Sequence, residues 1–207
     1  MSFEVIQSSL VESALIAAVR GGPGTPAADV LTAFALRRKA EGVRIVGVIV
    51  PPEETGHVPP HPPGNSHGEG HVQDHGGHPN CECRSELLDI ATGDRYAMHQ
   101  NLGSGSQACN LNSSSLALAS GAVERAIAQG PELVVLSRFG GQEATRGGLM
   151  AAFQAAVAAG VPVACVVTPK ADEVWADFAQ GLSVSLPAEG EALDAWWRAQ
   201  ARGRHAA

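Results

Sequence analysis

The sequence predicts an α/β fold, with a mostly parallel sheet flanked by helices on both faces and an added β-hairpin. Short β-branched apolar runs resemble strands buried on both faces, and amphipathic segments with capping residues and glycine stops lie between them. A Thr92-Gly93 turn separates two further strand-like runs. The 207 residues are most simply one domain, 1–207, which is long enough to bury a full core.

The first unit is a strand, a helix and a second strand. Residues 14–20 form an apolar run closed by glycines. Thr25 can cap the following helix, Pro26 suits its first position, and Gly42 is a stop signal. The β-branched run at 43–50 completes a βαβ unit, whose crossover should be right-handed.

Residues 51–80 differ in kind from the rest of the chain. These 30 residues include six His, seven Pro and six Gly. So few aliphatic side chains cannot bury enough apolar surface to offset the entropy of ordering the segment. We therefore expect an exposed, largely disordered His-rich insertion.

The chain after the insertion alternates strands and helices. Residues 85–100 predict the β-hairpin, and residues 101–115 a polar loop in which Ser113 or a neighbour caps the next helix. Further strands are expected at 132–139, 161–167 and 182–186. Further helices are expected at 116–130, at 148–160, at 171–181 after an opening by Thr168-Pro169, and in a last segment that holds Trp196 and Trp197. These two tryptophans pack the last helix either to the sheet or to a second copy in a homo-oligomer.

Composition limits the classes of function. A net charge of −7 argues against a nucleic-acid or anionic-membrane binder. The sequence has neither a signal peptide nor an apolar run of roughly 18–20 residues, so we expect a cytoplasmic protein. Four cysteines in a chain of this size do not indicate a disulfide framework, and Cys165 reads as a small buried side chain.

The stretch "AVRGGPGTPAADVL" (18–31) resembles a phosphate-binding P-loop without its chemistry. If Gly24 is the last loop glycine, Thr25 stands in the place of the lysine and Pro26 in that of the magnesium-binding hydroxyl. Lys39 should lie at the far end of the helix, and Lys170 could approach only from another strand end. Two interpretations stay open: a tight strand-to-helix turn, or anion binding by the helix N-terminus without lysine.

The segment "ELVVLSRFGGQE" (132–143) resembles the Walker-B segment of the thermophilic nucleoside-triphosphatase family. Ser137 falls on that family's magnesium-binding Asp and Arg138 on its catalytic Glu, whereas Gly140 and Glu143 match. "DIATGDRYAMH" (89–99) is similar to the hairpin of the same family. The resemblance implies a P-loop NTPase-like fold, and the substitutions predict no appreciable hydrolysis of nucleoside triphosphates by the P-loop route.

The chain also resembles a bacterial family of unknown function that is often encoded near molybdenum ABC-transporter genes. The similarity lies in "CECRSELLDIATGD", "QNLGSGSQACNLN" and "RFGGQEATRGGL", and it extends over the chain apart from 51–80. Ser137 and Gly141 stand where that family usually has Asn and Lys. The resemblance implies a link to molybdate.

Arg138 replaces a negative charge by a positive one at the end of a strand, which suits an anion such as phosphate or molybdate. The alternative is a structural ion pair with Glu143 or Glu132. In open α/β sheets ligands bind at the carboxyl ends of the strands, where two glycine loops should meet Arg138. The anion-binding or nucleotide-binding candidates are Gly21, Gly22, Gly24, Thr25, Gly103, Ser104, Gly105 and Arg138.

The insertion and the neighbouring thiols are candidates for binding a divalent metal. Imidazoles and thiolates suit zinc or nickel. The candidate ligands are His67, His71, His75, His78, Cys81, Cys83 and Cys109. The last four could form one site; weak capture at several sites and a plain solvated insertion are the alternatives.

We therefore expect a non-hydrolysing accessory protein on a degenerate P-loop scaffold that binds a small anion, a divalent metal or both, in molybdate or metal homeostasis. We expect neither nucleic acid nor membrane among its partners. The alternatives are a nucleotide hydrolase acting as a metallochaperone and a purely structural partner. No nucleophile–base pair predicts other catalysis.

Overall fold

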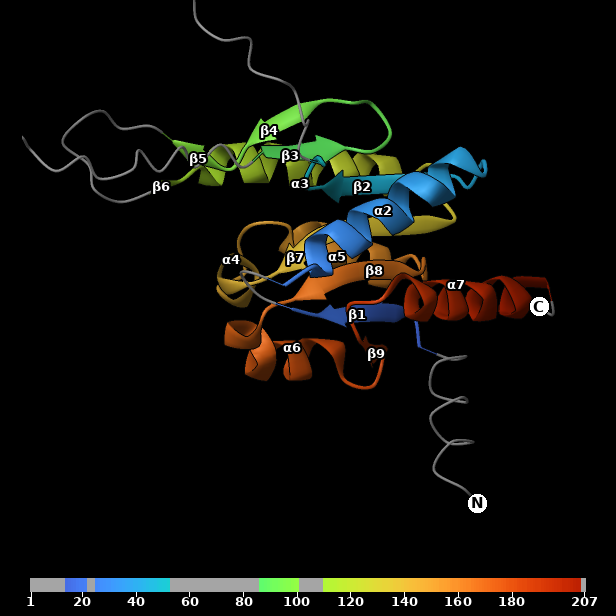
Figure 1. Ribbon diagram of the computed structural model, residues 1–207. Helices are drawn as coiled ribbons and strands as arrows, with labels where there is room; N and C mark the ends of the chain where they lie inside the picture. The colour runs from blue at the N-terminus through green and yellow to red at the C-terminus, as the bar shows by residue number, and fades with distance from the viewer. Residues whose placement is uncertain (1–13, 22–24, 53–85, 101–109, 206–207) are drawn as a thin grey trace, which may run out of the picture.

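The parallel sheet is confirmed by the computed structural model, which describes residues 14–21, 25–52, 86–100 and 110–205. A seven-stranded sheet runs in the order β4-β3-β2-β7-β8-β1-β9 (Figure 1). Five neighbouring strands are parallel: β2 (Ile45–Ile49), β7 (Leu133–Phe139), β8 (Val163–Val167), β1 (Ile16–Arg20) and β9 (Ser183–Leu186). The α/β class predicted from the sequence is therefore correct.

The predicted β-hairpin extends this sheet beyond β2. Its strands β3 (Glu86–Asp89) and β4 (Arg95–Ala97) are antiparallel, and β3 pairs with β2. The Asp89 carboxylate accepts hydrogen bonds from the amides of Ala91 and Thr92, which closes the turn. Two short strands, β5 (His99–Gln100) and β6 (Asn110–Leu111), form a separate ladder.

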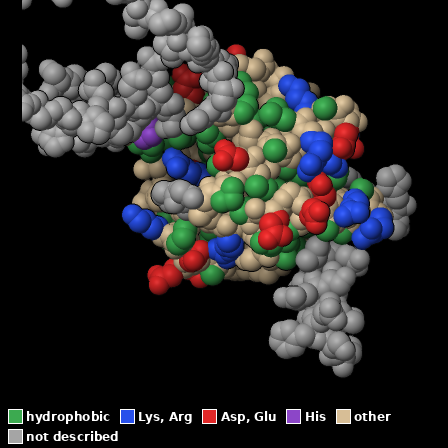
Figure 2. Space-filling model, in the orientation of Figure 1, with side chains coloured by type: hydrophobic (Ala, Val, Ile, Leu, Met, Phe, Trp, Pro, Cys, Tyr) green, Lys and Arg blue, Asp and Glu red, His purple; other side chains and the backbone are tan. Residues whose placement is uncertain are grey.

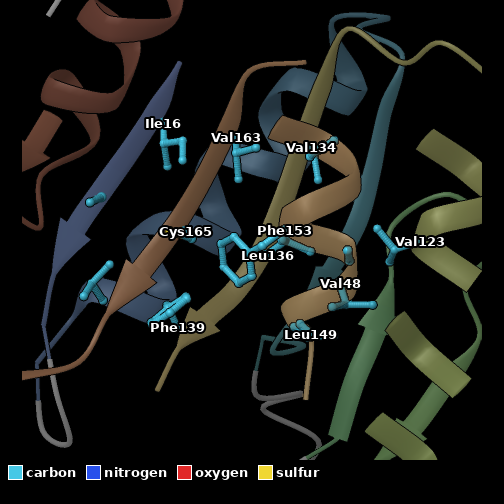
Figure 3. Close-up of a cluster of buried hydrophobic side chains, with 14 of the residues drawn as sticks. Ile16, Val48, Val123, Val134, Leu136, Phe139, Leu149, Phe153, Val163 and Cys165 are labelled. Atoms are coloured by element: carbon cyan, nitrogen blue, oxygen red, sulfur yellow. The ribbon is translucent and has the colours of Figure 1, made fainter. Parts of the chain in front are cut away.

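Helices cover both faces of the sheet. The helices α2 (Ala27–Ala40) and α7 (Gly190–His205) pack on one face, and α3 (Ser113–Ile127), α5 (Met150–Ala158) and α6 (Asp172–Ala179) on the other. Strand residues alternate between the two cores because successive side chains point to opposite faces. Figure 3 shows one core, with Ile16, Val163 and Val134 side by side on three neighbouring strands. None of the described helices is both long and apolar enough to cross a membrane.

The last helix packs on the sheet through its tryptophans. Trp196 and Trp197 are buried in the core beneath α2 and α7. The indole N–H of Trp196 also donates to the carbonyl of Ala14, 2.9 Å away, and so fixes the entry to β1. Of the two alternatives expected for these tryptophans, packing of the helix on the sheet is the one that the structure shows.

Several local predictions need correction. The N-cap position of α2 is occupied by Pro26, which offers no side-chain acceptor, and not by Thr25. Thr168 likewise makes no capping bond, and the helix expected after it is split into a 3₁₀ turn, η1 (Pro169–Ala171), and α6. The stop at Gly42 is correct, with φ at +85°. The insertion at 51–80 lies outside the described residues apart from its first two prolines.

Candidate functional site

The candidate site lies where β1, β8 and β7 end side by side. The ladder places Arg20 level with Val167, and Val167 level with Phe139. The chain leaves β1 for α2 on one face, whereas it leaves β7 and β8 for α5 and α6 on the other. In open α/β sheets, ligands bind at the carboxyl ends of adjacent strands whose connections diverge in this way.

The first glycine of the loop is required by the close turn into α2. The amide of Gly21 donates to the carbonyl of Val167 at 3.3 Å. A Cβ at position 21 would lie 2.3 Å from the Cβ of Ala27 and 2.6 Å from the Thr25 hydroxyl. The packing therefore accounts for Gly21 with or without a ligand, and both interpretations of the loop stay open. Gly22 and Gly24 lie outside the described residues, as do Gly103, Ser104 and Gly105.

A β-bulge in β7 determines where Arg138 lies. Between Leu136 and Phe139 the register against β8 shifts, since three steps along β7 match two along β8. The extra residue turns Phe139 into the core of α5 and α6, where its ring meets Trp175 edge-on at 4.9 Å. Bulges of this kind re-aim side chains beside binding sites. Here Arg138 is exposed on the strand end, while Ser137 is buried.

Arg138 makes no ion pair with any described residue. Its guanidinium lies 4.0 Å from the sulfur of Met98, a weak contact. The alternative ion pair expected for Arg138 is not formed, because Glu132 instead pairs with Arg44 and Glu143 accepts from backbone amides. An exposed cation at a strand end, with no ion-pair partner among the described residues, can bind an anion.

Glu143 organises the loop that follows β7. It is the third residue of α4 (Gly141–Ala144), and only 5% of it is exposed. One carboxylate oxygen accepts from the amide of Gly140 at 2.9 Å and the other from the amide of Leu149 at 2.9 Å. The buried charge is thus satisfied by backbone donors on both sides of the loop. The residue that matches the nucleoside-triphosphatase pattern therefore has a structural role here, which is to hold the loop after β7.

Arg20 and Thr168 belong to this edge but were not among the candidates from the sequence. Arg20 ends β1; its guanidinium forms an ion pair with Asp172 and donates to the Ser185 hydroxyl at 3.0 Å. Thr168 directly follows β8, and its hydroxyl donates to the carbonyl of Phe139 at 3.4 Å, which links two strand ends. A basic residue directly before the glycine loop was the available signal for Arg20.

The two lysines lie where the sequence places them. Lys39 is next to the last residue of α2, and its ammonium group donates to the carbonyl of Ile90 in the hairpin. Lys170 is exposed in η1, directly after β8. Lys170 therefore belongs to the candidate edge and Lys39 does not.

The metal candidates are not described by the structure. His67, His71, His75, His78, Cys81, Cys83 and Cys109 all fall in the segments 53–85 and 101–109. In the parts of the chain that are described, no three His, Cys, Asp or Glu side chains gather as a metal site. Cys165 is fully buried, and this burial raises the pKa of its thiol. It is a core residue, as predicted.

Similarity to known proteins agrees with part of this description. The chain is 41% identical over 118 residues to the molybdenum import ATP-binding protein ModC 2 of Bradyrhizobium diazoefficiens. That stretch is 57% of this chain but only 13% of the relative. No solved structure matches the chain. Residues 16–196, which hold all the parallel strands, match the family described as "Protein of unknown function (DUF2478)", and the chain belongs to this family.

Proposed function

We propose that this protein binds a small oxyanion, such as molybdate, at the carboxyl ends of β1, β8 and β7. The observation that carries the proposal is Arg138, an exposed guanidinium without an ion pair among the described residues. The amide end of α2 lies at the same edge and favours negative charge. A tetrahedral oxyanion would provide the acceptors that a guanidinium fork binds in pairs.

The scaffold fits a P-loop protein that no longer hydrolyses nucleotides. In P-loop enzymes the Lys, the magnesium-binding hydroxyl and the Walker-B acid neutralise the phosphates. Thr25, Pro26 and Ser137 stand at these places here. Loss of one charge-stabilising group costs roughly a thousandfold in rate, so loss of three leaves binding as the remaining function.

The link to molybdenum comes from similarity. The relative named above is a molybdenum import ATP-binding protein, and the aligned stretch is a small part of it. We propose that this chain serves molybdenum homeostasis as an accessory protein. Its six-histidine insertion would add weak capture of zinc or nickel.

Calorimetric titration with sodium molybdate tests the anion site. Arg138→Ala should weaken binding by at least tenfold, since a hydrogen bond to a charged group contributes about 1.5–3 kcal/mol. Arg198→Ala is the matched control: it removes the same charge from α7, beside Asp194 at the far end of α2. Unchanged affinity in Arg138→Ala, or equal losses in the two variants, would refute the assignment of Arg138.

A nucleotide hydrolase that acts as a metallochaperone is the second candidate, favoured by the ATP-binding name of the relative. Turnover of ATP or GTP with magnesium distinguishes the two functions, because binding alone is compatible with both. Hydrolysis by the parent that is lost on mutating residues 21–25 would replace the accessory function by an enzymatic one.

Metal capture is tested by titration with zinc and with nickel. The parent should bind more metal per chain than a variant from which residues 57–78 are deleted. Equal stoichiometry in the parent and the deletion variant would refute capture by the insertion and leave the anion site untouched.

A further inference from the structure

Arg20 and Arg138 flank one strand end at the same level. Arg20 is level with Val167 of β8, and Val167 with Phe139, the neighbour of Arg138. Adjacent strands lie about 4.8 Å apart, so one strand separates the two arginine backbones by roughly 10 Å. Two long side chains separated in this way can both reach an anion seated above the end of β8.

The two arginines differ in what they contact. Among the described residues, the Arg138 guanidinium has only the contact with the Met98 sulfur, whereas Arg20 pairs with the Asp172 carboxylate and the Ser185 hydroxyl. The pair is open to solvent, with 40% of the Arg20 side chain and 55% of the Asp172 side chain exposed. Exposed ion pairs contribute little to stability, so this one can be exchanged at little cost.

We infer that Arg20 is a second binding residue of the anion site and that Asp172 occupies it as an internal competitor until the anion arrives. The inference rests on the proposed function. A divalent oxyanion carries twice the charge of Asp172 and more acceptors, so it can displace the carboxylate. Asp172 thereby lowers the apparent affinity of the site for any anion that must displace it from Arg20.

Asp172 lies close to the strand end at which the anion would bind. It is the first residue of α6 and follows η1, which begins directly after β8. Ser185 lies on β9, level with Ala18 of β1. The Arg20 guanidinium therefore leans toward β9 in this structure, and anion binding would turn it toward β8.

The test is a titration of the full chain with sodium molybdate, compared among the parent, three test variants and one control variant. Asp172→Asn should bind about two- to fivefold more tightly, the range that corresponds to the loss of an exposed ion pair. Arg20→Ala should bind more weakly than the parent, and Asp172→Asn should give no gain in the Arg20→Ala background. Asp177→Asn is the matched control, because it removes one exposed charge from the same helix.

A second readout follows the side chain itself. The Nε–Hε resonance of Arg20 should shift when molybdate is added to the parent, and Arg20→Lys should restore part of the affinity lost in Arg20→Ala. Circular dichroism checks that each variant is folded.

The outcomes separate this inference from the proposed function. If the parent binds molybdate and Asp172→Asn matches the parent or Asp177→Asn, Asp172 does not compete for Arg20, and if Arg20→Ala also matches the parent, Arg20 is not a binding residue; in both cases the site at Arg138 stands. If neither the parent nor Asp172→Asn binds molybdate, sulfate or phosphate, the proposed anion site is itself wrong. Binding that appears only in Asp172→Asn supports both.

Discussion

Glu143 offers the sharpest test of how the site is held together. Its carboxylate is buried and accepts one hydrogen bond from Gly140 and one from Leu149, each of 2.9 Å. In Glu143→Gln the side chain keeps its shape but only one acceptor, and its NH₂ group faces a backbone N–H. One charge-assisted bond is lost, the other is weakened, and two buried donors are left unsatisfied.

These losses set the expected magnitude. A hydrogen bond to a charged group contributes about 1.5–3 kcal/mol, and an unsatisfied buried group costs about 1–3 kcal/mol. Allowing for partial relaxation of the loop, Glu143→Gln should lower the free energy of unfolding by about 2–4 kcal/mol. For a chain of this length the melting temperature should fall by on the order of 10 °C.

The assay is urea unfolding followed by tryptophan fluorescence and circular dichroism, with Asp177→Asn as the control. Asp177 is exposed on α6, so its amide variant should stay within about 0.5 kcal/mol of the parent. Hydrogen exchange at Leu149 reports the loop directly. If Glu143→Gln unfolds at the same urea concentration as Asp177→Asn, with an unchanged m-value and protected Leu149, the bracing role of Glu143 is refuted.

Three further predictions concern the core. Gly47→Ala should lower the free energy of unfolding in urea by more than about 3 kcal/mol, because φ is +127° and a Cβ would lie 1.9 Å from the Val135 carbonyl oxygen. Gly203 in α7 is the control, since it is exposed and a Cβ there would meet no atom within 4 Å. A loss of stability in Gly203→Ala as large as that in Gly47→Ala would contradict this reasoning. A variant with Cys81, Cys83 and Cys109 replaced by Ser should show no reactive thiol until it unfolds. The reason is that its remaining thiol, that of Cys165, is fully buried. Stoichiometric labelling of the folded variant would contradict the burial of Cys165. Burial raises the pKa of the Cys165 thiol, and burial together with the charges of Asp89 and Asp94 raises the pKa of Tyr96 against an opposing effect of Arg125. Both groups stay protonated in the folded chain at a pH where the unfolded chain loses these protons, so the free energy of unfolding should fall as pH rises above about 9–10. A free energy of unfolding that does not change over this alkaline range would contradict the prediction.

Much of the fold could be predicted from the sequence because the buried runs are local signals. The β-branched segment at 43–50 and the run at 161–167 predict strands covered on both faces, and the Thr92-Gly93 turn predicts the hairpin. The order of the strands is a property of the whole chain, and no local pattern reports that β8 lies between β1 and β7.

The candidate site was harder to predict because it depends on register. Arg138 was identified from its place at the end of a strand, but the bulge that exposes it appears only in the pairing of β7 with β8. Arg20 looked like the last residue of an ordinary strand. Its role at the edge depends on Asp172 and Ser185, which are more than 150 residues away in sequence and close only after folding.

The most direct test of the central claim is the anomalous signal of molybdenum in crystals of the full chain grown with molybdate. The binding proposal predicts one strong peak at the carboxyl ends of β1, β8 and β7, in contact with Arg138. A molybdenum peak away from this edge would contradict it, as would a magnesium–nucleotide complex ligated in the loop after β1.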